Sequence, residues 1–266
     1  SSSTFSLAEI LRYRGLFWNL SMRDVLVRYK QTTIGVLWAI VRPAINIAIF
    51  VFFSQFIEGG SDLNARIVNV GAGIIIWTLI STSVTDVSNS LLSNSNILTK
   101  VYFPKLIIPL STLTVCLIDF MISFIILTIC KIIVGGMPGP EFLLFPVFVL
   151  YGLLFSFSIG LIFATLNVKY RDIKFLLPFL LQIGFYVCPV FLSSSFYLEK
   201  LPATLKPVFL MNPLVTVIEG FKYCFTGKPF ELEIIYVLSG LAITIVLGLF
   251  GLRYFTKFEK TFADYI

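Results

Sequence analysis

The sequence contains no histidine among its 266 residues, and only 13% of them are charged. Histidine is the usual general base beside a serine or cysteine nucleophile and a common metal ligand, so its absence excludes those sites within this chain. A soluble globular domain carries about 25% charged residues, roughly twice the share found here. The chain is therefore expected to be neither a histidine-dependent enzyme nor an ordinary soluble domain.

Motifs that hold phosphates or metals are also missing. The stretch TGKPF at 226–230 lacks the upstream glycine and the spacing of a P-loop, and no DDxxD pair is present to hold a metal against a diphosphate. The cysteines form no CxxC pair and read as small hydrophobic residues: Cys116, Cys130, Cys188 and Cys224. We expect no metal, no cofactor and no ATP site in this chain, which also disfavours a membrane glycosyl or prenyl transferase.

What the sequence has in abundance is hydrophobic residues, at 58%, with a mean hydropathy of +0.95. Apolar runs of about 20 residues are long enough to cross a ~30 Å hydrocarbon core. Six such runs are present, and the expected transmembrane spans are 34–57, 68–92, 106–134, 142–166, 175–192 and 234–255. The net charge of +6 does not indicate nucleic-acid binding, because the cations flank apolar runs instead of clustering on a solvated face.

Two further segments are helical without spanning. Residues 5–30 alternate polar and apolar groups at helical spacing, which predicts an amphipathic helix in the membrane interface. Residues 196–227 are apolar but broken by prolines, which predicts a re-entrant helical pair between spans five and six. The predicted fold class is thus an all-α polytopic membrane protein, with one transmembrane domain over residues 1–266.

Orientation follows from the distribution of lysine and arginine, which are enriched in cytoplasmic loops. With both termini in the cytoplasm, the outer side keeps only a minority of the 20 cations: Arg66, Lys131, Lys200, Lys206, Lys222 and Lys228. On the inner side, three cations are expected to anchor the interface helix to membrane lipid: Arg23, Arg28 and Lys30. Anionic headgroups favour each such cation by ~1 kcal/mol.

Two carboxylates, Asp86 and Asp119, fall inside the expected spans, where a charge is costly. Asp119 either forms a polar contact with a neighbouring helix or contacts the transported species. A proton-coupled secondary transporter would need such a carboxylate, and this residue is the best support for that alternative.

Two helix faces carry aromatic and amide side chains at helical spacing. The fifth span aligns Phe175, Phe179, Gln182 and Tyr186, and the first aligns Trp38, Arg42, Asn46, Phe53 and Phe56. Aromatic faces offer sugar rings an apolar contact, while amides supply hydrogen bonds without a fixed charge. The alternative is ordinary helix packing. Arg42 either meets a lipid-linked diphosphate or snorkels to anchor its helix.

Four sequence blocks, in this order, resemble the permease subunits of type-2 ABC exporters for bacterial surface polysaccharides: RDVLVRYKQTTIGVLWAIVRP, NVKYRDIKFLLPFLLQIGFYVCPV, MNPLVTVIEGFK and FEKTFADYI. The likeness covers nearly the whole chain. One departure is Arg42, since members of that group commonly carry a neutral residue before the proline of the first span.

The resemblance implies a homodimer of permeases in the bacterial inner membrane, joined to two copies of a P-loop ATPase that binds ATP and Mg. It also implies which residues contact that ATPase: Asn94, Asn96, Lys100, Tyr102, Lys105, Tyr170, Arg171 and Asp172. The implied substrate is a polysaccharide on an undecaprenyl diphosphate anchor, with O-antigen as the expected polymer and capsule or wall teichoic acid as alternatives.

Overall fold

The computed structural model describes residues 12–30, 37–59, 62–98, 103–170, 172–228, 232–259 and 262, and every regular element within these ranges is a helix. The elements are α2 (Arg14–Lys30), α3 (Leu37–Glu58), α4 (Leu63–Ser93), α5 (Ser95–Leu98), α6 (Ile107–Gly135), the 3-10 helix η1 (Pro140–Leu144), α7 (Phe145–Lys169), α8 (Ile173–Val187), α9 (Ser194–Lys200), α10 (Lys206–Leu210), α11 (Pro213–Thr226) and α12 (Ile234–Phe258). The all-α prediction is confirmed for these residues.

In the part of the chain that the structure describes, five stretches are long and apolar enough to cross a membrane: Ile40–Glu58, Leu63–Ser93, Ile107–Gly135, Pro140–Lys169 and Ile234–Phe258. They coincide with five of the six expected spans. The remaining expected span, 175–192, corresponds to α8, which has only 15 residues and is therefore about 22 Å long. The count of six spans stays a prediction, because α8 alone is shorter than a ~30 Å core.

Local sequence explains several helix ends. Asp62 caps α4, because its carboxylate accepts hydrogen bonds from the backbone N–H groups of Asn64 and Ala65 at 3.0 and 3.3 Å. Asn212 caps α11 in the same way, and Gly227 ends that helix in the left-handed conformation, with φ of 62°. Both ends of α11 are thus specified by the residues next to it.

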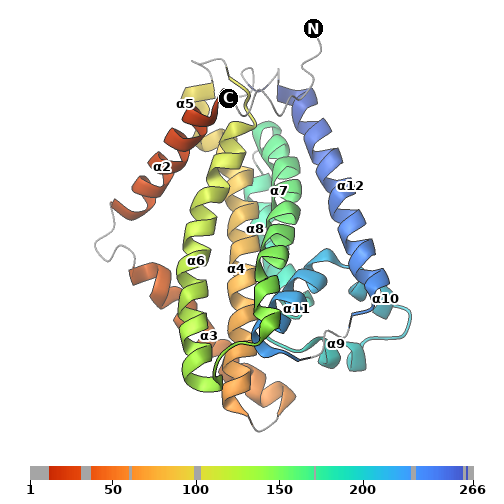
Figure 1. The fold of residues 1–266 in the computed structure, drawn as a ribbon. Helices are drawn as coiled ribbons and strands as arrows, with labels where there is room; N and C mark the ends of the chain where they lie inside the picture. Colours follow the sequence, from red (N-terminus) through yellow and green to blue (C-terminus); the bar gives the residue numbers. More distant parts are fainter. Residues whose placement is uncertain are drawn as a thin grey trace.

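The core is built around α4, which lies between α6 and α7 in Figure 1. Its neighbours also include α11, so one end of the bundle is filled by a helix that does not span. In contrast, α3 and α12 lie at the outside, and few of their residues are buried. The region predicted as a re-entrant pair contains three short helices, α9, α10 and α11, at the end of the bundle away from α5. Its re-entrant character stays a prediction.

A second, smaller hydrophobic cluster lies at the opposite end, which carries α5 and the C-terminal end of α12 (Figure 1). It contains Leu20 of α2, Leu98 of α5 and Phe255 of α12. Phe103, which precedes α6, and residues of α6 and α7 complete it. We call this hydrophobic cluster the end cluster.

The interface helix predicted over 5–30 is described from residue 12 onward. Its helical part, α2, starts at the end cluster and runs obliquely beside α6.

Candidate functional site

The aromatic face predicted on α8 lies outside the core of the chain. Phe175 is 72% exposed, and Phe179, Gln182 and Tyr186 are also exposed. The buried side of the same helix carries other residues, such as Leu177. The predicted residues therefore share the side of α8 that this subunit leaves uncovered, and their role in a passage stays a prediction.

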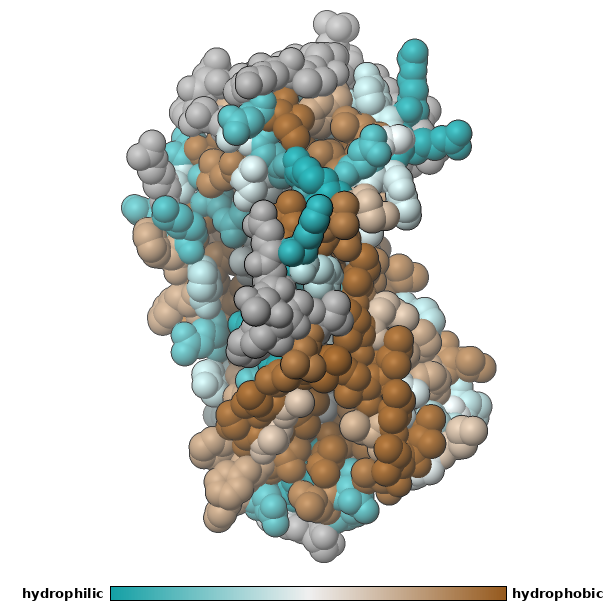
Figure 2. All heavy atoms as spheres, turned by 90° about the vertical axis from the view of Figure 1, so that its left-hand side faces the viewer, coloured by the Kyte–Doolittle hydropathy of each residue, from teal (hydrophilic) through white to brown (hydrophobic). Residues whose placement is uncertain are grey.

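The face predicted on α3 is exposed as well. Phe56 is 74% exposed, Phe53 and Arg42 are exposed, and Asn46 is half-buried. The side chain of Trp38 lies outside the described residues. Figure 2 shows the side of the molecule that lies at the left in Figure 1. Hydrophobic residues cover much of its lower half, and polar side chains gather toward the end with α5.

The seam between α3 and α8 is made by residues that the sequence analysis did not single out. Phe50 of α3 lies with its ring centroid 4.8 Å from that of Phe185 of α8 and 5.0 Å from that of Phe191. Trp77 of α4 meets Phe185 edge to face at 5.9 Å. The two helices thus pack through one set of aromatic residues and expose another.

A turn after α8, over residues 188–193, holds the ends of several helices together. Glu58, the last residue of α3, accepts hydrogen bonds from the Ser193 N–H and hydroxyl at 2.6 and 2.7 Å. The hydroxyl of Tyr197 donates to the carbonyls of Tyr186 and Cys188 at 2.9 and 3.2 Å. Burial raises the pKa of Tyr197 to about 12, so its hydroxyl stays protonated and keeps donating near neutral pH. We call this segment the outer turn, because the orientation predicted from the lysine and arginine distribution would place it on the outer side.

Glu58→Ala tests the link between α3 and the outer turn. The Ser193 N–H and hydroxyl would lose their acceptor, and a hydrogen bond to a charged group contributes about 1.5–3 kcal/mol. We expect the free energy of unfolding in detergent to fall by roughly that amount. The matched control is Glu199→Ala on exposed α9, for which we expect a change within about 0.5 kcal/mol. Equal effects of the two substitutions would contradict this link.

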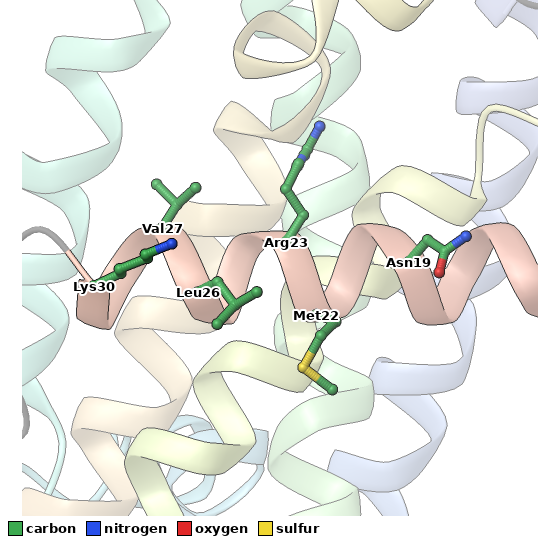
Figure 3. A pocket seen from close by; sticks show the side chains of 6 residues that line it. All are labelled: Asn19, Met22, Arg23, Leu26, Val27 and Lys30. Carbon is green, nitrogen blue, oxygen red and sulfur yellow. The ribbon is translucent and has the colours of Figure 1, made fainter.

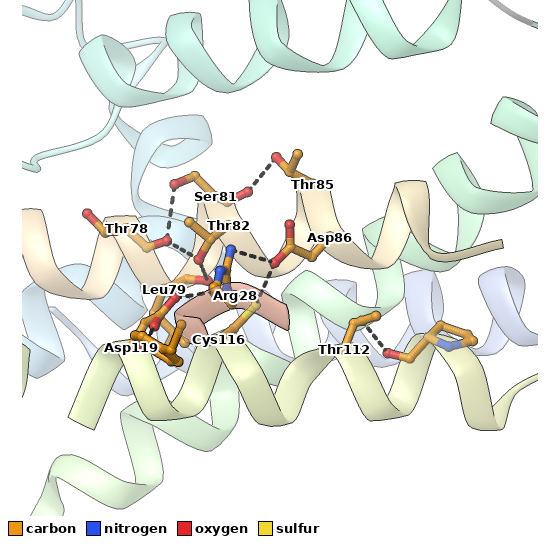
Figure 4. A network of polar contacts seen from close by, with 12 residues as sticks. Arg28, Thr78, Leu79, Ser81, Thr82, Thr85, Asp86, Thr112, Cys116 and Asp119 are labelled. Carbon is orange, nitrogen blue, oxygen red and sulfur yellow. Dashed lines mark hydrogen bonds and ion pairs between the residues drawn. The ribbon is translucent and has the colours of Figure 1, made fainter. Parts of the chain in front are cut away.

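The most strongly charged group within the bundle joins α2, α4 and α6 (Figure 4). The Arg28 guanidinium lies with Nη2 3.2 Å from Oδ2 of Asp86 and with Nη1 2.8 Å from Oδ2 of Asp119. The Tyr29 hydroxyl donates to Oδ1 of Asp119, and the Cys116 thiol donates to Oδ2 of Asp86 at 3.4 Å. We call Arg28, Tyr29, Asp86 and Asp119 the charged cluster.

Within the charged cluster, the pKa values of Arg28 and Tyr29 are both raised. Burial is the largest single influence on Arg28 and lowers its pKa, but Asp86 and Asp119 together outweigh it, so the pKa is raised. Burial, followed by the hydrogen bond to Asp119, raises the pKa of Tyr29. Near neutral pH the guanidinium therefore stays charged and the phenol stays a donor.

The sequence analysis did not predict the ion pairs that Arg28 makes with Asp86 and Asp119. It predicted that Arg28, like Arg23 and Lys30, binds lipid headgroups. A usable signal was present, since two carboxylates inside spans need a cation that can reach them. The direction in which Arg28 points, however, depends on how α2 lies against the bundle. Headgroup anchoring by these three residues stays a prediction.

The opposite side of α2 is hollowed. A cavity there has a volume of about 380 Å³. Figure 3 labels the side chains that line it: Asn19, Met22, Arg23, Leu26, Val27 and Lys30. Arg23 also binds within the chain, because its guanidinium donates to Asp24 at 2.6 Å and to Oδ1 of Asn94 at 2.5 Å. Lys30 is exposed at the end of the helix.

The residues expected to contact an ATPase divide into buried and exposed groups. Asn94 is buried, and Lys105 is tied to the end of α12, since its Nζ donates to the Glu259 carbonyl at 2.6 Å. Asn96, Tyr170 and Asp172 are exposed. Lys100, Tyr102 and Arg171 lie outside the described residues. Among the residues that the structure describes, no group of three or more cysteine and acidic side chains could hold a metal ion.

Five long apolar helices and ion pairs within the bundle define a multi-pass helical membrane protein. Residues 15–226 match the ABC-2 type transporter family, and the chain belongs to this family. Such chains are the membrane components of ABC transporters, so family membership implies an ABC ATPase as a partner.

Similar curated proteins share most of the chain's length. A protein of Myxococcus xanthus named O-antigen export system permease protein RfbA is 27% identical over 217 residues, which is 82% of each chain. Two proteins of the same name from Klebsiella pneumoniae are 25% and 26% identical over 248 residues, which is 92% of each chain.

Proposed function

We propose that this chain is the permease of an ATP-driven exporter that carries an undecaprenyl-diphosphate-linked polysaccharide, namely O-antigen, across the bacterial inner membrane. The observation that carries this proposal is the similarity to O-antigen export permeases over 82% to 92% of both chains.

The proposed assembly is a homodimer with both termini in the cytoplasm and with two copies of a P-loop ATPase. The exposed faces of α3 and α8 support the homodimer, because both carry large aromatic residues that a second copy of the chain could cover. The lysine and arginine distribution supports the orientation. The partner would bind ATP and Mg, and this chain would bind no cofactor.

In the proposed mechanism, closure of the ATPases moves the segment 94–105, together with Tyr170, Arg171 and Asp172. The end cluster supports this route, since Leu98 and Phe103 from that segment pack with α2, α7 and α12. A displacement there would shift several helices at once, because packed cores transmit strain. Separation of α3 and α8 across the dimer would then open the passage.

Within the passage, the predicted faces would contact the glycan. Phe175, Phe179 and Tyr186 would offer apolar sliding surfaces, and Gln182 and Asn46 would supply hydrogen bonds. Arg42 would either meet the diphosphate at the inner leaflet or anchor α3. These side chains would act by contact, with no covalent step in this chain.

The test is to delete the gene and follow the polymer. We expect the lipid-linked polysaccharide to accumulate on the cytoplasmic side, and its chemical identity decides among O-antigen, capsule and wall teichoic acid. Vesicles that contain the purified permease and its ATPase should translocate the polymer only with hydrolysable ATP. A wild-type level of surface polymer in the deletion strain would refute the proposal.

A proton-coupled carrier is the alternative from another class, and it depends on Asp86 and Asp119. Their pairing with Arg28 argues against it, because both carboxylates already have a cationic partner inside the chain, with guanidinium contacts of 3.2 and 2.8 Å. Vesicles distinguish the two, since a proton-coupled carrier would move polymer with a proton gradient and no ATP. Transport under that condition would favour the alternative.

A further inference from the structure

Helix α2 is attached to the spanning helices by a ladder of polar contacts. Near its middle, the Ser21 hydroxyl lies 3.3 Å from that of Thr114 on α6, and Arg23 donates to Asn94 at the end of α4. The last contact in the ladder is the charged cluster, where Arg28 meets α4 and α6 together. The final turn of α2 is thus held mainly by charge.

The charged cluster lies within the depth of the spans. Asp86 lies seven residues before the last residue of α4, and Asp119 lies twelve residues after the first residue of α6. At 1.5 Å per residue these positions are about 10 and 18 Å along the helices from the end cluster. A cation at the end of α2 therefore reaches two carboxylates at a depth where they need a partner.

One guanidinium bridges carboxylates from two different helices. Its nitrogens form a rigid planar fork, so both contacts are made only while α2, α4 and α6 keep this arrangement. Movement of α2 away from the bundle would leave two negative charges facing each other without their counter-ion. Figure 4 shows Arg28 between the two spanning helices.

The other end of α2 belongs to the end cluster. Leu20 is buried there, and Phe17 packs against it beside residues of α5, α6, α7 and α12. A helix of 17 residues, about 25 Å long, therefore connects the segment that contains Leu98 and Phe103 with the charged cluster. Displacement of one end of α2 would also displace its other end, since a regular helix resists bending.

We propose that Arg28, Asp86 and Asp119 are positioning residues that couple movement of the cytoplasmic end to α4 and α6 through α2. This inference rests on the proposed ATP-driven export. It gives the three residues no contact with the polysaccharide, and it gives the carboxylates a role other than proton transfer. Breaking the cluster would let ATP hydrolysis continue without moving the spanning helices.

The first test measures coupling in the complete complex in lipid vesicles. We expect Arg28→Gln to lower the amount of polymer exported per ATP hydrolysed by about tenfold, within the 5- to 150-fold range typical of coupling between sites. ATP hydrolysis itself should change less than about twofold. Arg28→Lys keeps the charge but loses the fork, so we expect an intermediate ratio. The matched control, Arg14→Gln, changes an exposed cation on the same helix and should leave the ratio unchanged.

A second variant separates coupling from folding. Arg28→Met combined with Asp86→Asn and Asp119→Asn leaves no unpaired charge, so the protein should fold and assemble with its ATPase. We expect the export ratio to stay low in this variant. A wild-type ratio in an assembled complex of this variant would overturn the proposal.

A third measurement does not depend on export. Hydrogen exchange of the purified permease should show faster exchange in residues 21–30 of Arg28→Gln than in residues 21–30 of Arg14→Gln. Equal exchange in both variants would overturn the proposal, even if export is ATP-driven. If the wild-type complex exports without ATP, the proposed function fails, while the exchange result still decides whether Arg28 holds α2.

Discussion

Replacement of Lys222 by methionine should lower the free energy of unfolding by about 3–5 kcal/mol, the cost of removing one member of a buried ion pair. Lys222 is only 2% exposed. Its Nζ donates to the carbonyls of Pro189 and Leu192, the latter at 3.0 Å, and lies 3.3 Å from the Glu219 carboxylate. The methionine would fill similar space but leave the carboxylate and both carbonyls without this donor.

The measurement is unfolding in detergent by heat or denaturant, compared with Lys228→Met. Lys228 is exposed and lies at the same end of the bundle, so we expect its replacement to change stability by less than about 0.5 kcal/mol. The outer turn should also become more accessible to protease in Lys222→Met, because Lys222 binds two of its carbonyls. Similar stabilities for the two variants would show that the buried amine is not structurally important.

Gly73→Ala is the second substitution for which we expect a large effect. A Cβ atom at Gly73 would lie 1.9 Å from the carbonyl oxygen of Val190 and 2.9 Å from Cε of Lys222. Backbone atoms cannot move aside as a flexible side chain can, so α4 and the outer turn must separate. We expect a loss of about 3 kcal/mol or more, at the upper end of the cost of overpacking.

Gly71→Ala, on the same helix two residues earlier, is the matched control. Its Cβ would meet the Cδ1 atom of Leu127 at 2.8 Å, which is the far end of a side chain that can rotate. We expect a change of about 1 kcal/mol or less, measured as folded yield and unfolding midpoint. If Gly73→Ala were tolerated as well as Gly71→Ala, the close approach of the outer turn to α4 would be wrong.

Both predictions concern one feature, which is how the C-terminal end of α8 is held. The outer turn is bound by Lys222 of α11, contacts Gly73 of α4 and receives Glu58 from α3. The predicted passage faces of α3 and α8 are therefore tied to one segment. Any separation of these helices during the proposed export would have to move or break that segment.

Much of the fold could be predicted from the sequence, because hydrophobic length is local information. Five of the expected spans coincide with helices long enough to cross a membrane. The exception, α8, shows where the approach weakens: residues 188–192 are apolar but form the outer turn, so hydropathy extended the expected span beyond the end of the helix at Val187.

The candidate sites were predictable to a smaller extent. Periodicity along α8 places Phe175, Phe179 and Tyr186 on one face, since helical spacing alone decides which residues share a face, and all three are exposed. It did not reveal that Phe50 and Phe185 make the seam between α3 and α8. That seam depends on the rotation and separation of two helices, which are more than a hundred residues apart in the chain.

The sequence by itself determined that this protein is a helical membrane protein, and its motifs indicated the exporter family. The tertiary structure decided which charges meet. Arg28 and Asp119 are both visible in the sequence, but their 2.8 Å contact exists only because α2 lies obliquely along α6. Hydrophobic burial acts through local composition and so leaves a pattern in the chain, whereas an ion pair between helices depends on directions and distances that only packing sets.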